Sequence, residues 1–81
     1  MTGSQLFTED TTKLALRNRL VEAFESHCRG QVDKSLANVE VLLSNPTGIG
    51  EHGDILAEIE KHLGEAAKYT ELGAMMTKHF R

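Results

Sequence analysis

The stretch Asn45–Gly53 constrains the fold of this chain more than any other feature, because it holds the only proline and three of the seven glycines. Proline fixes its own φ and disfavours helical geometry in the residue before it. Glycine permits the positive φ values of tight turns. The stretch separates two segments in which apolar residues recur at helical intervals. We therefore predict a shaped connection between two helices, with Asp54 capping the second one.

The segment before this connection has apolar residues every three or four positions from residue 9 to residue 44, which indicates a helix. The apolar stripe consists of Leu16, Leu20, Phe24, Cys28, Val32, Leu36, Val39 and Leu43. Gly30 weakens this helix, since a glycine in a helix interior costs about 1 kcal/mol relative to alanine. Because the stripe continues in register through Gly30, we favour one long helix, with a bend at Gly30 left open. The alternative is two helices, at residues 9–28 and 31–44.

The second helix is predicted over residues 54–78. Its stripe includes Ile55, Ile59, Leu63 and Met76. Small residues gather between Gly64 and Ala74, and they permit a partner helix to approach closely. The predicted fold is an all-α helical hairpin, a single domain at residues 8–81 that follows a flexible N-terminal arm at residues 1–7.

A chain of 81 residues buries a modest core, and folds of this size often rely on disulfides, a metal ion or oligomerisation. Cys28 is the only cysteine, so it cannot form a disulfide within the chain, and we expect it to be a small core residue. No grouping of cysteine and histidine has the spacing of a structural zinc site. We therefore expect the apolar stripes to join copies of the chain into a dimer or a larger helical bundle.

The formal net charge of −3 at pH 7 disfavours nonspecific binding to nucleic acid. No apolar run approaches the ~18 residues of a membrane span, and the N-terminus lacks the basic and apolar regions of a secretion signal. A single cysteine fits a reducing compartment. We expect a cytoplasmic protein without membrane contact.

The connection also holds the candidates for ligand or partner binding, which are Asn45, Gly48, Gly50, Glu51 and His52. Glycine-rich turns before a helix can bind anions through backbone N–H groups. Residues 48–53 match the Gly-x-Gly-x-x-Gly string of dinucleotide-binding folds, but that fingerprint needs a preceding strand, and a helix is predicted there. We favour a structural role, in which these residues shape the turn.

Two pairs of acid and histidine raise the question of catalysis: Glu51 with His52, and Glu58 with His62 four residues apart on the second helix. Neither pair supplies the three metal ligands or the nucleophile that a hydrolytic site requires. We predict no enzymatic activity, no bound metal and no cofactor, with Glu58 and His62 forming a surface pair.

The sequence from Val39 to Ile55 contains the string Asn-Pro-Thr-Gly-Ile-Gly-Glu-His, and an acidic amphipathic helix follows it. It resembles a group of small uncharacterised proteins of tailed bacteriophages that share an Asn-Pro-x-Gly-x-Gly-Glu-His core between two helices. The resemblance covers residues 32–72 and leaves out residues 8–30. It implies a phage origin and a helical hairpin, and it supplies no catalytic residue.

These features favour a non-enzymatic phage protein that acts as an oligomeric protein-interaction module, with a host or phage protein as its partner. Two alternatives stay open. One is a module that sequesters a small ligand, such as a nucleotide or an anion, in the Asn45–Gly53 loop. The other is a minor structural component of the virion. The expected location is the host cytoplasm, or the virion in the last case.

Overall fold

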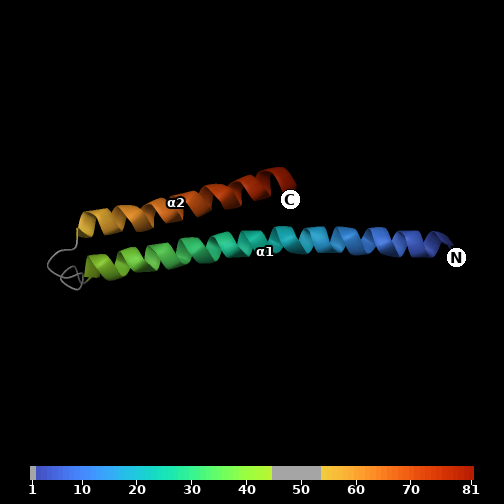
Figure 1. Cartoon of the computed structure of the whole chain (residues 1–81), viewed down its shortest axis with the longest axis horizontal. Coiled ribbons are helices and arrows are strands. Elements are labelled where there is room, and N and C mark those ends of the chain that lie inside the picture. Colours follow the sequence, from blue (N-terminus) through green and yellow to red (C-terminus); the bar gives the residue numbers. More distant parts are fainter. Residues whose placement is uncertain (1, 45–53) are drawn as a thin grey trace.

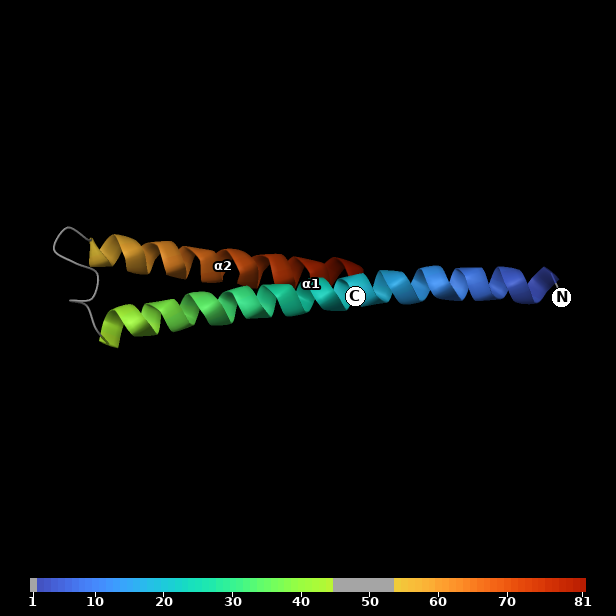
Figure 2. The same ribbon diagram turned by 60° about the horizontal axis from the view of Figure 1, so that its bottom comes forward.

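In the computed structural model of the chain, residues 2–44 and 54–81 are described, with side chains described from residue 10 onward. The described residues form two α-helices, α1 over Thr2–Ser44 and α2 over Ile55–Phe80. The helices lie side by side and run in opposite directions (Figures 1 and 2). The all-α helical hairpin predicted from the sequence is confirmed.

The helix boundaries differ from the predicted ones mainly at the N-terminus. The helix α1 begins at Thr2 rather than near residue 9, so residues 2–7, predicted as an arm, have helical conformation. It continues through Gly30 without a break, as favoured. Gly30 is tolerated because it faces away from α2, and no atom lies within 4 Å of where its Cβ would be.

The start of α2 is set by its capping residue. Asp54 has extended backbone geometry, with φ −88° and ψ 101°, and its Oδ1 accepts a hydrogen bond from the Ala57 backbone N–H at 3.1 Å. This bond satisfies one of the amide donors that the first turn of a helix leaves free. The helix then continues to Phe80, two residues beyond the predicted end, and the basic Lys78 and His79 in its last turn suit the helix dipole.

Because α1 is longer than α2, one end of the molecule is a single helix. The C-terminal end of α2 lies beside α1 at Arg17, whose Nη2 donates to the Phe80 carbonyl at 2.6 Å. Residues 2–16 of α1, the N-terminal overhang, extend beyond it (Figure 1). The molecule is consequently a rod, 72 Å long and 20 by 17 Å across.

The contact face of each helix follows an alternating spacing of four and three residues. In α1 the buried and half-buried positions on this face are Val21, Glu25, Cys28, Val32, Ser35, Val39 and Leu42. In α2 they are Ile55, Ile59, His62, Ala66, Tyr69, Gly73 and Met76. This is the heptad spacing of a coiled coil, which keeps one seam facing the partner helix.

The heptad face divides the predicted stripe into residues that contact the other helix and residues that do not. Steps of four residues, such as Leu16–Leu20–Phe24–Cys28, advance about 40° beyond a full turn each time and drift around the helix. Cys28 and Val39 are accordingly buried, whereas Leu20, Leu36 and Leu43 are exposed. Ser35 and Glu25, which the stripe left out, belong to the contact face instead.

The register of the two helices is fixed by Cys28 and Gly73, because a Cβ atom added to Gly73 would lie 3.3 Å from the Cys28 Cβ. Extending the heptads from this contact pairs Val21 with Phe80, Glu25 with Met76, Val32 with Tyr69, Ser35 with Ala66, Val39 with His62, and Leu42 with Ile59. The side chains of Ser35 and Ala66, among the most buried of the described part, are thereby placed opposite one another.

The core between the helices is built from small residues. The buried hydrophobic residues are Val21, Cys28, Val39 and Ala66. Large side chains are instead exposed, namely Leu14, Leu16, Leu20, Leu36, Val41, Leu43, Leu56, Leu63, Leu72, Met75 and Phe80. The fully buried hydrophobic positions hold small or medium-sized residues, the larger residues of the contact face, such as Leu42 and Ile59, are half-buried, and many other large hydrophobic residues are exposed.

Candidate functional site

The candidate binding residues of the connection, Asn45, Gly48, Gly50, Glu51 and His52, lie outside the described residues. Their roles stay predictions. The described part of the chain carries a different candidate site, on one flank of the hairpin.

Four of the exposed leucines lie on this flank. Leu36 and Leu43 of α1 directly follow contact-face residues, and so do Leu56 and Leu63 of α2. In an antiparallel coiled coil such positions of both helices border the core on the same side. The register pairs Leu36 with Leu63 and Leu43 with Leu56. We call these four residues the leucine ridge; their exposed fractions run from 46% to 73%.

A groove with a volume of about 580 Å³ follows the ridge along the same flank. Its lining includes Cys28, Val32, Gly73 and Ala74. Glycine and alanine at positions 73 and 74 leave room that larger side chains would fill. Arg29 stands in the heptad position of the ridge leucines, seven residues before Leu36, which is why the groove continues the ridge. Ridge and groove together form what we call the apolar flank.

Charged residues border the two halves of the flank differently. Glu40 lies four residues after Leu36, and Glu60 lies four residues after Leu56, so both acids neighbour the ridge on the helix surface. The groove is lined by the basic Arg29 and Lys78 and by the acidic Asp33 and Glu25, of which Glu25 is paired with Arg81. The ridge therefore has an acidic border, and the groove has a mixed one that includes two basic groups.

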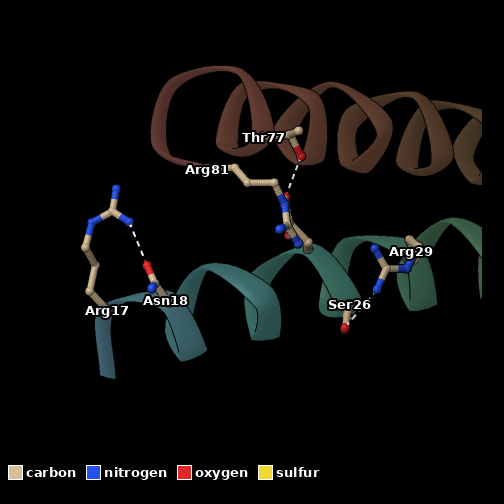
Figure 3. A network of polar contacts seen from close by, with 7 residues as sticks. Arg17, Asn18, Ser26, Arg29, Thr77 and Arg81 are labelled. Carbon is tan, nitrogen blue, oxygen red and sulfur yellow. Dashed lines mark hydrogen bonds and ion pairs between the residues drawn. The ribbon is translucent and has the colours of Figure 1, made fainter. Parts of the chain in front are cut away.

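Glu25 sits at the far end of the groove and ties the C-terminal end of α2 to α1. Its Oε2 accepts from the Thr77 hydroxyl at 2.6 Å, and its Oε1 accepts from Arg81 Nη2 at 2.7 Å. Figure 3 shows Thr77 and Arg81 extending from α2 towards α1. Together with the bond from Arg17 to the Phe80 carbonyl, these contacts form what we call the terminal clasp.

The clasp shifts the protonation equilibria of both its charged groups. Hydrogen bonds from Arg81 and then from Thr77 lower the pKa of Glu25, against the opposing effect of its burial. The carboxylate in turn raises the pKa of Arg81. The side chain of Glu25 is only 6% exposed while that of Arg81 is 56% exposed, so the ion pair stands at the edge of the interface.

The other flank carries two histidine contacts. The ring of His27 packs edge-on against Tyr69 with centroids 5.6 Å apart, and it also neighbours Phe24. On α2, His62 Nε2 lies 3.7 Å from Glu58 Oε2, in the pairing expected from their spacing. These contacts engage both histidines in packing or pairing within the hairpin.

Within the part of the chain that the structure describes, no three His, Cys, Asp or Glu side chains are grouped closely enough to hold a metal ion. Neither described helix has the length and hydropathy needed to cross a membrane. Cys28 is buried against Gly73. What the described arrangement offers chemically is a non-polar contact surface with a charged border.

Sequence reasoning missed the terminal clasp, and it did not separate the apolar flank from the contact face. The predicted stripe joins contact residues such as Cys28 and Val39 with ridge residues such as Leu36 and Leu43, because it advances mostly in steps of four. The signal that would have divided them is the alternation of four and three from Val21 to Leu42, which separates contact positions from flanking ones. No family model, curated protein or solved structure matches this chain.

Proposed function

We propose that this hairpin is a non-enzymatic protein-interaction module that binds another helical surface through its apolar flank. The observation that supports the proposal is the exposure of the leucine ridge: the fully buried hydrophobic residues are valine, cysteine and alanine, while four leucines on one flank are about half exposed or more. Monomeric proteins rarely leave large contiguous apolar patches exposed, and those that do commonly bind a partner there.

The free energy available at this flank is sufficient for binding. Full burial of one leucine contributes about 1.5–3 kcal/mol. The ridge has four leucines that are each about half exposed or more. Covering them would contribute on the order of 5 kcal/mol, before the groove is counted. A helix that lies along the flank would reach ridge and groove together.

The partner class stays as the sequence predicted it: further copies of the chain, and a protein of the phage or its host if the gene is a phage gene. The small-ligand alternative at Asn45–Gly53 lies outside the described residues and stays a prediction. The groove is a second place where a small ligand could bind, since about 580 Å³ falls within the usual size range of ligand sites. Its lining is mainly apolar, which suits a hydrophobic ligand rather than a nucleotide or an anion.

The proposal is tested by weakening the flank without touching the hairpin core. Leu63→Gln should abolish association, either with other copies or with a stoichiometric partner purified from the cells that carry the gene. Circular dichroism should show unchanged helix content, because Leu63 is 46% exposed. A wild-type chain that stays monomeric at micromolar concentration and retains no stoichiometric partner would contradict the proposal.

A further inference from the structure

We propose that the occupant of the apolar flank is a second copy of this chain, related by a two-fold axis that places the leucine ridge of each copy in the groove of the other. The inference rests on the proposed function and names its partner. It follows from shape, from charge and from the composition of the opposite flank.

The flank has complementary shapes at its two ends. The ridge occupies residues 36–43 of α1 with residues 56–63 of α2, and the groove occupies residues 25–33 with residues 69–78. A two-fold axis that runs between the two copies at the level of Asp33, perpendicular to the helices, exchanges these two halves. Each copy then contributes one ridge and one groove, as a closed symmetric interface requires.

The charges along the flank favour the same exchange. The acids beside the ridge, Glu40 and Glu60, come to face the half of the other copy that carries Arg29 and Lys78. Of the two acids in that half, Glu25 is already paired with Arg81 of its own copy, which leaves Asp33. Asp33 lies near the axis, one helical turn from Arg29 of its own copy, which moderates its repulsion from its counterpart. Charge complementarity of this kind fixes register and disfavours other partners.

The resulting arrangement is a four-helix bundle in which each α1 faces the other α1 and each α2 the other α2, all antiparallel. Antiparallel neighbours around an apolar core are the ordinary geometry of such bundles. The opposite flank fits a second copy less well. Its exposed hydrophobic residues alternate along the helices with charged ones. The hydrophobic residues are Leu20, Val41, Leu72 and Met75. The heptad position that holds Leu20, Val41 and Met75 is occupied elsewhere on this flank by Lys34, Lys61 and Lys68.

The first experiment compares two exposed leucines by light scattering with the full-length chain. The wild type should have the mass of a dimer at micromolar concentration. Leu56→Glu, on the ridge, should halve the measured mass, while Leu20→Glu, on the opposite flank, should leave it unchanged. Both side chains are more than 60% exposed, so neither substitution is expected to unfold the hairpin. Dissociation by Leu20→Glu but not by Leu56→Glu would overturn the inference.

The second experiment tests the axis itself, in a Cys28→Ala background. Asp33→Cys places one cysteine per copy next to the proposed axis, and mild oxidation should link the copies covalently. Lys34→Cys, the matched control, points to the opposite flank and should not link. Efficient linking through position 34 instead of position 33 would overturn the arrangement.

The third experiment exchanges charges across the interface. Arg29→Glu and Glu40→Arg should each weaken the dimer, and the double variant should recover it. Recovery would not occur if the two residues lie on unrelated surfaces. A monomeric wild type that nevertheless holds a different protein in stoichiometric amount would overturn this inference and leave the proposed function standing.

Discussion

Glu25 is a charged side chain in the contact face of a hairpin whose core is otherwise small and mostly apolar. A buried carboxylate is unfavourable unless its oxygens are bonded. Here Thr77 and Arg81 supply the donors, so that Glu25 stabilises the end of α2 that no connection holds. The bonds to Glu25 hold Thr77 and Arg81 beside it, and they thereby also set the register of the helices at this end.

The lowered pKa of Glu25 predicts a loss of stability in acid. A carboxyl whose folded-state pKa lies below its ordinary value of 4.5 stabilises the fold above that pH, and the contribution disappears as the pH falls through the folded-state pKa. Glu25→Gln should therefore lower the melting temperature at pH 7, and its difference from the wild type should shrink below pH 4.5.

The matched control for this measurement is Glu71→Gln, an exposed acid on α2. It should leave the melting temperature at pH 7 nearly unchanged. A difference between Glu25→Gln and the wild type that stays constant into acid would show that the clasp does not depend on ionised Glu25.

Three helical glycines of the hairpin differ in what surrounds them, and alanine substitution should separate them. Apart from the local helix backbone, no atom lies within 4 Å of an added Cβ at Gly30 or Gly64, so alanine there should raise the free energy of unfolding by about 1 kcal/mol. At Gly73 the new Cβ would meet Cys28 at 3.3 Å, which offsets this gain. Gly73→Leu should destabilise the hairpin by about 1–3 kcal/mol, because it overfills a close contact.

Urea denaturation at one fixed protein concentration measures these changes. If Gly73→Leu proved as stable as the wild type, the close contact at Cys28 could not be what sets the register of α1 against α2.

At the scale of the elements, α2 depends on its N-terminal cap and on packing rather than on length. Asp54 provides the cap through its bond to the Ala57 N–H. Asp54→Ala should lower the free energy of unfolding by about 1 kcal/mol, the usual loss on removing such a cap. Asp54→Asn should retain most of the stability of the wild type, since the side-chain oxygen of asparagine can accept the same hydrogen bond. Equal losses for both variants would mean that the charge, through the helix dipole, matters more than the hydrogen bond.

The two helices and the capping residue could be predicted from the sequence because they depend on local signals: helical periodicity, one proline, and an aspartate before an apolar run. The continuity of α1 through Gly30 followed from the register of the apolar residues on either side. The extension of α1 to Thr2 could not be predicted, because residues 1–7 lack a strong helical pattern.

The interaction surface was harder to predict for a physical reason. Leu36 and Leu43 have the hydrophobicity of core residues, and only their position relative to Ser35 and Leu42 shows that they flank the contact face. Polar and small residues such as Glu25 and Ser35 hide a heptad pattern from a search for hydrophobic stripes. The clasp depends on residues 52 to 63 positions apart in the sequence, which no local signal reveals.

At the scale of the whole molecule, the shape is far from that of a compact domain. The Cα radius of gyration is 20.2 Å, whereas a compact chain of this length would have about 12 Å. Two rods joined side by side and two rods joined end to end form dimers with very different radii of gyration. Small-angle X-ray scattering can therefore distinguish the flank dimer from a dimer joined through the N-terminal overhangs.

With the axis near Asp33, a rise of 1.5 Å per residue puts the centres of the two copies close together, and the radius of gyration should increase only by about a tenth. A dimer joined end to end, with its axis within residues 2–16, should instead increase the radius by about half or more. We expect the mass to double with the smaller increase. Deleting residues 1–12 should preserve that dimer, because the overhang lies outside both the ridge and the groove. A doubled mass with the larger radius, lost on this deletion, would place the contact on the overhang and contradict the flank arrangement.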